Sequence, residues 1–198
     1  MRTGVWNHNI HYHSLVLGLV PSNCDLALDV GCGQGLLARR LATRCRHVIG
    51  IDADRATLLR AANAKPTEDH LTFVHGDVLA YPFTSGSIDL ITVVAAIHHL
   101  PLKPALRRLR DLLKPGGILI VVGLYRNRSL VDHAWACAAL PSSWILRLRN
   151  GHMDVGAPVH EPQETLSEIE GASAALLPGA IIQRRLLFRY SLVWRKPQ

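Results

Sequence analysis

The sequence predicts an α/β fold in which a mostly parallel β-sheet is covered by helices on both faces. The chain has 198 residues, of which 48% are hydrophobic, enough for one compact domain with a sizeable core. Along residues 26–124, short apolar runs alternate with stretches of helical periodicity, a pattern typical of βαβ units. The run 88–94 is mostly apolar and rich in β-branched residues, which indicates a strand buried on both faces.

Local signals define each element of this sheet. Pro21 ends the first helical pattern, and Pro66 lies just beyond the end of another. The glycine-rich stretch 31–35 forms a turn after the first strand, and the motif KPGG predicts a second turn after an amphipathic helix. In chain order, we expect helix 10–20, strand 26–30, helix 36–44, strand 47–51, helix 54–64, strands 71–75 and 88–94, helix 102–113 and strand 118–124.

The pattern changes after Arg126. We expect an extra helix over 130–149, interrupted at Pro141, then a loop over 152–162 and a helix over 164–177. The last strands, 180–186 and 190–195, are too close in sequence for a helical crossover, so they should pair antiparallel. The predicted organisation is a single domain over 1–198, made of an N-terminal helical segment (1–22), a ligand-binding core (23–125), a cap over the sheet edge (126–162) and a closing helix with hairpin (163–198).

Composition limits the class of protein. The net charge of +7 suggests an anionic partner, but the arginines are spread thinly and no aromatic–basic motif accompanies them, which makes nucleic acid a less favoured partner. The cysteines, Cys24, Cys32, Cys45 and Cys137, contain no Cys-x-x-Cys pair, so we expect buried thiols and no metal site. No apolar run is long enough to span a membrane and no signal-peptide core is present, so the expectation is a soluble, cytoplasmic protein.

The motif LDVGCGQG, residues 28–35, follows the first strand and predicts a ligand-binding loop. Glycines let a ligand approach the backbone closely, and the start of the following helix offers free N–H groups. Two ligands fit: a dinucleotide or S-adenosylmethionine (SAM). The dinucleotide fingerprint Gly-x-Gly-x-x-Gly fails because Leu36 occupies the position of the third glycine. Asp29 also suits a ligand that carries an ammonium and a sulfonium better than one with two phosphates.

Two further carboxylates follow the next two strands. Asp52 ends the strand in VIGIDAD, where a carboxylate can accept hydrogen bonds from both hydroxyls of a ribose. Asp77, in FVHGDVLAYPF, can accept from an exocyclic amine such as that of adenine. Each has a structural alternative: Asp52 could cap the helix that begins near Asp54, and Asp77 could be a turn residue.

The motifs LDVGCGQG, VIGIDAD, VHGDVLAYPF, IDLITVVAAIHHL and LLKPGGILIVVGL resemble, in order and spacing over residues 25–124, the successive motifs of class I SAM-dependent methyltransferases. The tail GAIIQRRLLFRYSLVWRKP resembles the closing antiparallel hairpin of these enzymes. The resemblance implies a three-layer Rossmann-like sandwich with seven strands, the last of them antiparallel. It also implies SAM as cofactor, S-adenosylhomocysteine as product and methyl transfer as the reaction.

By this resemblance, the glycine loop holds the methionine end of SAM and the acid before it orients the amino group or the loop. The acid after the second strand holds the ribose, the acid after the third meets the adenine amine, and two alanines after the fourth lie under the sulfonium. The implied cofactor-binding residues are Asp29, Gly31, Cys32, Gly33, Gly35, Asp52, Ala53, Asp77, Val78, Ala95 and Ala96.

The N-terminal segment NHNIHYHSLVLGLVP supplies further candidates. Some related methyltransferases use a Tyr or His from such a segment to hold the SAM carboxylate or to close the pocket. We therefore expect His11, Tyr12 and His13 at the cofactor. Two other interpretations stay open, namely a metal site built from His8 and His11 at helical spacing and an ordinary surface helix.

The end of the fourth strand bears on the substrate. Its residues 95–98 lack the acid-or-Asn, Pro, Pro, aromatic box shared by amino methyltransferases that act on adenine, and the ending HHL resembles small-molecule methyltransferases. His98 and His99 are candidate general bases, with loop fixation or helix capping as the alternative. We expect methyl transfer to a small molecule. The alternatives are an RNA methyltransferase, a non-catalytic SAM-binding protein and, disfavoured by Leu36, a nicotinamide-dependent reductase.

Overall fold

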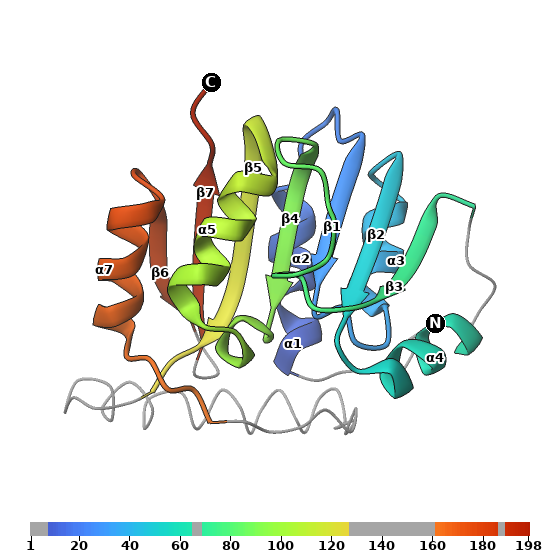
Figure 1. Ribbon diagram of the computed structural model, residues 1–198, viewed down its shortest axis with the longest axis horizontal. Helices are drawn as coiled ribbons and strands as arrows, with labels where there is room; N and C mark the ends of the chain where they lie inside the picture. The colour runs from blue at the N-terminus through green and yellow to red at the C-terminus, as the bar shows by residue number, and fades with distance from the viewer. Residues whose placement is uncertain (1–7, 65–68, 127–160, 186–188) are drawn as a thin grey trace.

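A seven-stranded sheet forms the middle layer of the computed structural model, which describes residues 8–64, 69–126, 161–185 and 189–198 (Figure 1). The strands lie in the order β3-β2-β1-β4-β5-β7-β6. Strands β1 to β5 pair parallel, whereas β7 runs antiparallel to both β5 and β6. Their bounds are β1 (Leu26–Val30), β2 (His47–Asp52), β3 (Leu71–His75), β4 (Ile88–Val94), β5 (Leu113–Leu124), β6 (Ile181–Arg185) and β7 (Arg189–Arg195). The predicted fold class and closing hairpin are confirmed.

Helices cover both faces of the sheet. In Figure 1, α5 and α7 lie in front of the sheet, and α2 and α3 lie behind it. The described helices are α1 (His8–His11), α2 (His13–Gly18), α3 (Leu36–Ala42), α4 (Arg55–Ala64), the 3₁₀ turn η1 (Ile97–His99), α5 (Leu102–Leu112) and α7 (Leu166–Leu176). A reciprocal capping box starts α7, in which Thr165 and Glu168 bond each other's backbone N–H groups. None of the described helices is both long and apolar enough to cross a membrane.

Each face of the sheet carries its own core, which explains the apolar runs in the central strands. In β5, Leu119 and Val121 pack in the cluster under α5 and α7, while Ile118, Ile120 and Val122 pack in the cluster under α2 and α3. Alternate residues of one strand therefore enter opposite cores, as expected for a parallel strand buried on both sides.

The motif KPGG was predicted as a turn, and this is wrong. Strand β5 already begins at Leu113 and includes the motif. Ile88 pairs with Leu113 and Leu90 with Ile118, so the extra residues of β5 bulge out of the ladder. Gly116 adopts φ +77°, which lets the bulge form. The single helix predicted over 10–20 is likewise two short helices, α1 and α2, which meet at Tyr12.

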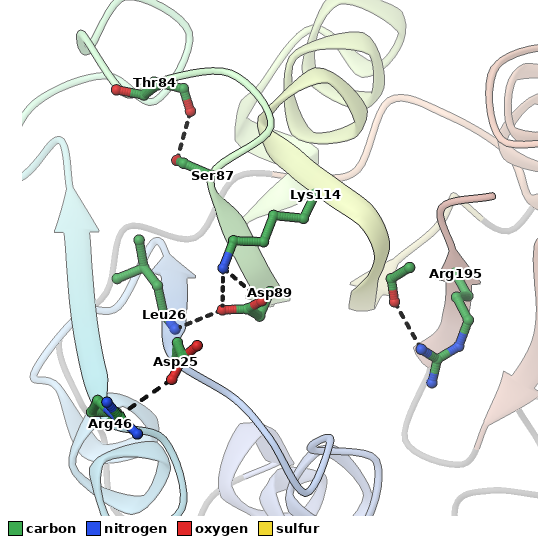
Figure 2. A network of polar contacts seen from close by, with 9 residues as sticks. Asp25, Leu26, Arg46, Thr84, Ser87, Asp89, Lys114 and Arg195 are labelled. Atoms are coloured by element: carbon green, nitrogen blue, oxygen red, sulfur yellow. Dashed lines mark hydrogen bonds and ion pairs between the residues drawn. The ribbon is translucent and has the colours of Figure 1, made fainter. Parts of the chain in front are cut away.

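A polar network ties together the amino ends of the central strands (Figure 2). The Asp89 carboxylate accepts hydrogen bonds from the backbone N–H of Leu26 at 2.8 Å and from Lys114 Nζ at 2.9 and 3.0 Å. Asp25 and Arg46 form an ion pair of 3.4 Å next to it. Strands β1, β2, β4 and β5 are thus aligned at one edge, and their carboxyl ends meet at the other.

The predicted helix over 130–149 and most of the loop over 152–162 lie outside the described residues, so the cap stays a prediction. The predicted division of the domain into segments stays a prediction as well. The helix predicted over 164–177 corresponds to α7, and the strands predicted over 180–186 and 190–195 correspond to β6 and β7.

Candidate cofactor and active site

A cavity of about 330 Å³ opens at the carboxyl edge of the sheet, between the ends of β1, β2 and β4 and the N-terminal helices. This is the edge at which open α/β sheets bind their ligands. Most residues proposed from the sequence line it. They are His13, Asp29, Gly31, Cys32, Gly33, Asp52, Ala53, Asp77, Val78, Ala95, Ala96 and His99.

The glycine loop after β1 folds tightly against its neighbours. The N–H groups of Gly31 and Cys32 both donate to the Ile51 carbonyl, at 2.8 and 3.1 Å. Gly31 has φ +66°, and a Cβ built on it would lie 2.3 Å from Ala96 Cβ, so the loop packs directly on the residues after β4. Gly35 is not among the cavity-lining residues, because it packs against the ring of Phe73, 2.4 Å from where its Cβ would stand. The sequence suggested Gly35 as a cofactor-binding residue, whereas the structure shows it packed against Phe73.

Asp52 connects the ends of β1 and β2 through its carboxylate. Its Oδ2 accepts from the Gly33 N–H at 2.8 Å, and its Oδ1 accepts from the Asp54 N–H at 2.9 Å. The helix-capping interpretation applies to Asp54 instead, whose carboxylate accepts from the Ala56 N–H at 2.9 Å and the Thr57 hydroxyl at 2.6 Å. Asp52 is therefore free to hold the glycine loop and to face the cavity.

Asp29 is a buried carboxyl group beneath the loop. Only 2% of the residue is exposed, and its Oδ1 accepts from the Thr92 hydroxyl at 2.8 Å. Burial raises the pKa of Asp29 to about 7, against the opposing effect of the Thr92 hydrogen bond and with a smaller contribution from the nearby Asp52 charge. This carboxyl group changes charge near neutral pH, so a cation placed beside it would favour the ionised form.

Asp29 should make the stability of the ligand-free protein depend on pH. Its pKa of about 7 in the folded state lies above the value near 3.9 of an unfolded chain, so the folded protein binds a proton that the unfolded chain has released. Stability relative to Asp29→Asn should fall by up to about 4 kcal/mol as the pH rises from about 4 to about 7, and then level off. Urea unfolding of both proteins across this range measures the difference. Curves that stay parallel would contradict the assignment.

Asp77 is a turn residue that also lines the cavity. Its Oδ1 accepts from the Leu79 N–H at 2.9 Å and its carbonyl from the Tyr81 N–H at 2.8 Å, which is the geometry of a turn residue. It nevertheless lines the cavity, next to the buried Val78. The turn thus aims the residue at the cavity, and the two interpretations do not exclude each other.

The two adjacent histidines after β4 occupy different positions. His99 lines the cavity and is exposed, whereas His98 is not among its lining residues. Their ring centroids are 4.1 Å apart. Ala95 has φ +54°, an uncommon conformation for a residue with a Cβ, and it leads the chain into the short turn η1 that orients both rings.

The three candidates from the N-terminal segment also occupy different positions relative to the cavity. His13 lines the cavity and is buried, and burial lowers its pKa to about 4, so the ring is neutral at pH 7. His11 and Tyr12 do not line the cavity. Tyr12 instead belongs to the core under α2 and α3, because it lies at the break between α1 and α2, where its side chain turns inward.

Asn9 lines the cavity but was missed from the sequence. Its Oδ1 accepts a hydrogen bond from the buried Arg189 of β7 at 2.8 Å, which ties the N-terminal helices to the far side of the sheet. Asn9 lies in α1 and His13 in α2, so no spacing within one helix pointed to Asn9 from the sequence. Among the described residues, no group of three or more His, Cys, Asp or Glu side chains is placed to hold a metal ion.

Comparisons with known proteins match this arrangement. A family model described as a methyltransferase domain matches residues 28–121, from the glycine loop to β5. The YcgJ protein of Bacillus subtilis has a solved structure with a TM-score of 0.66 at 25% identity, covering 88% of this chain and 70% of that one. The N-methyltransferase NodS of Bradyrhizobium japonicum, in complex with S-adenosyl-L-homocysteine, shares the fold with a TM-score of 0.65 at 19% identity, covering 97% of this chain and 89% of NodS.

Sequence relatives extend over almost the whole chain. An uncharacterized methyltransferase of Mycobacterium bovis is 37% identical over 194 residues, which cover 97% of this chain and 98% of the relative. A ubiquinone biosynthesis O-methyltransferase of Marinobacter nauticus is 36% identical over 107 residues, or 51% of this chain and 44% of that protein. With the glycine loop and the acids at or near the carboxyl ends of β1, β2 and β3 gathered at one cavity, this likeness shows that the chain belongs to the SAM-dependent methyltransferase family.

Proposed function

We propose that the protein methylates a small molecule bound beside SAM in the cavity at the carboxyl edge of the sheet. The observation that carries this proposal is the convergence of Asp29, Asp52 and residues 31–34 of the glycine loop on one cavity. When bound, SAM supplies a methyl group activated by its sulfonium. The chain's own task is to hold the cofactor, to place the acceptor in line with that methyl and to exclude water.

The residues present fit SAM. A Cβ built on Gly33 would meet no protein atom within 4 Å, so a ligand can approach the backbone there. Asp29 would lie near the ammonium of the methionine moiety, and its pKa of about 7 lets that cation hold it ionised. Asp52 would receive the ribose hydroxyls, with Ala53 and Val78 beside the adenine and Asp77 at its amine.

His13 and Asn9 would close the methionine end of the site. Both line the cavity from the N-terminal helices, and the neutral ring of His13 can donate one hydrogen bond to a carboxylate. The hydrogen bond from Arg189 fixes the Asn9 side chain, which favours a preformed wall over a flexible one. These two residues replace His11 and Tyr12 in our proposal.

A small acceptor is supported by the relatives. Among the relatives are the ubiquinone biosynthesis O-methyltransferase and a sterol 24-C-methyltransferase of Gibberella zeae, which is 33% identical over 130 residues, or 61% of this chain and 34% of that protein.

His99 is the candidate general base. It lines the same cavity as Ala95 and Ala96, which we place under the reacting methyl. A neutral imidazole there can take the proton that a hydroxyl loses as its oxygen forms the new bond to carbon, or the proton that an ammonium must lose before its nitrogen can attack.

The test is release of S-adenosylhomocysteine from SAM by the full chain, with a panel of phenols, quinols, sterols, small amines and short RNAs as acceptors. Turnover with one class of small molecule is the expected result. Turnover with RNA alone, and with a steep dependence on salt, would contradict the proposed acceptor class. SAM binding without turnover of any acceptor would contradict the proposal that the protein methylates a small molecule of these classes.

Replacing the two histidines one at a time should distinguish the general base from a residue with only a structural role. With an acceptor that must lose a proton, His99→Ala should lower kcat about 10²–10⁴-fold and leave the SAM dissociation constant nearly unchanged, because the loss is in proton transfer. His98→Ala is the matched control and should lower kcat far less. A larger loss of kcat in His98→Ala than in His99→Ala would contradict the assignment.

A further inference from the structure

Two buried thiols meet at the edge of the sheet opposite to the cofactor cavity. Cys24 lies two residues before the start of β1, and Cys45 lies between α3 and β2. They are 5% and 4% exposed and belong to the same core cluster. Their side chains are joined by a hydrogen bond. The proposed methyl transfer uses neither of them.

The pairing of β1 with β2 sets the distance between these two residues. Leu26 lies opposite His47, and hydrogen bonds continue the pairing backward, from the His47 N–H to the Asp25 carbonyl at 2.8 Å and from the Arg46 N–H to the Cys24 carbonyl at 2.9 Å. The ion pair between Asp25 and Arg46 in Figure 2 marks the same register. Cys24 and Cys45 therefore lie on neighbouring segments of the polypeptide, which are about 5 Å apart.

This geometry meets the requirements of a disulfide bond. Bonded cysteines have Cα atoms roughly 4.4–6.8 Å apart and side chains that point toward each other. Neighbouring segments of the sheet provide the first condition, and the packing of both side chains in one core cluster, on the same face of the sheet, supports the second. We propose that Cys24 and Cys45 are an oxidisable pair that forms an intramolecular disulfide bond when the protein meets a peroxide.

The two thiols have different roles in the reaction. The hydrogen bond from Cys24 lowers the pKa of Cys45, and the same bond, together with burial, raises the pKa of Cys24. Cys45 is therefore the thiol that ionises and attacks, and Cys24 the thiol that resolves.

In the first step, the Cys45 thiolate attacks one oxygen of hydrogen peroxide, the O–O bond breaks, and the released hydroxide takes up a proton to become water. In the second step, the Cys24 sulfur attacks the resulting sulfenic acid, the S–S bond forms, and the S–O bond breaks. The hydroxyl leaves as water with the proton of Cys24. Two thiols and one peroxide thus give one disulfide and two waters.

The disulfide would tie the ends of a single structural unit. Residues 24–45 hold β1, the glycine loop and α3, so the bond closes a loop around the segment that builds the floor of the cavity. A covalent bond across such a loop restricts the unfolded chain more than the folded one. Oxidation should therefore stabilise this unit without altering its folded geometry.

The experiment oxidises the reduced full-length protein with hydrogen peroxide, alkylates the remaining thiols after denaturation, and maps the cysteines by mass spectrometry without reduction. The expected product is a cross-linked peptide pair that contains Cys24 and Cys45, 2 Da lighter than the two thiols and restored by dithiothreitol. The melting midpoint of the oxidised protein should rise by about 5–10 °C.

Single variants identify the two roles. In Cys24→Ser, which keeps a hydrogen-bond donor beside Cys45, peroxide should leave a sulfenic acid at Cys45 that a dimedone probe captures, and the rise in melting midpoint should vanish. Pairing of either residue with Cys32 or Cys137, or recovery of both as alkylated thiols after peroxide treatment, would overturn the inference. If a variant fails to fold, the cysteine mapping of the wild-type protein still shows whether Cys24 and Cys45 form the disulfide bond.

Discussion

Asp52→Asn is expected to raise the dissociation constant of SAM about 10- to 100-fold. The carboxylate holds the Gly33 and Asp54 N–H groups through its two oxygens, and in our proposal the same oxygens accept from the ribose hydroxyls. The amide keeps one acceptor oxygen and turns the other position into a donor, which can no longer accept from a ribose hydroxyl. A hydrogen bond to a charged group contributes about 1.5–3 kcal/mol, so the loss of one such bond corresponds to this fold-change.

Isothermal titration calorimetry with SAM and with S-adenosylhomocysteine measures the effect directly. The matched control is Asp111→Asn, the same substitution at the exposed end of α5, where the carboxylate pairs only with Arg110 at 2.9 Å. The control should bind SAM like the wild type. Equal affinity in Asp52→Asn and wild type would contradict the role of Asp52.

Gly31→Ala and Gly33→Ala are expected to fail for different reasons, although they lie two residues apart. A Cβ on Gly31 would stand 2.3 Å from Ala96 Cβ, which is too short to survive without movement of the backbone, and φ is +66°. Overpacking and the left-handed conformation together cost about 3 kcal/mol. The melting midpoint of the ligand-free protein should fall by about 6–12 °C.

Gly33→Ala should leave the ligand-free protein closer to the wild type. Its φ of +54° disfavours alanine, but the added Cβ meets no protein atom within 4 Å, so the cost is about 1–2 kcal/mol. The same methyl points into the space where a ligand approaches, so SAM affinity should fall strongly. Melting curves of both variants, with and without SAM, separate the two effects. A larger loss of ligand-free stability in Gly33→Ala than in Gly31→Ala would contradict this account.

The sequence predicted the sheet well where the signal was local and repeated. The glycine loop and the acids at or near the carboxyl ends of β1, β2 and β3 were placed at one edge, because parallel strands bring their carboxyl ends together. The KPGG motif was misjudged, because proline and glycine serve a bulge as well as a turn. Only the long-range pairing of β5 with β4 decides between the two.

The candidate site was less predictable where orientation mattered. Adjacent histidines have identical local signals, and only the turn η1 after Ala95 determines that His99 faces the cavity. Similarly, the break at Tyr12 turns its ring into the core, whereas His13 and Asn9 reach the cavity. The bond from Arg189 to Asn9 joins residues 180 positions apart, and no local pattern contains it.

The most direct test of the central claim is thermal melting of the pure protein with SAM, S-adenosylhomocysteine or NAD, each far above its expected dissociation constant. A ligand at a hundredfold its dissociation constant stabilises the folded state by about 2.7 kcal/mol, which raises the midpoint of a chain of this size by about 5–10 °C. We expect this rise with SAM and S-adenosylhomocysteine, no rise with NAD, and loss of the rise in Asp52→Asn. A rise with NAD alone, or none with the two sulfur ligands, would contradict the assignment of the cavity to SAM.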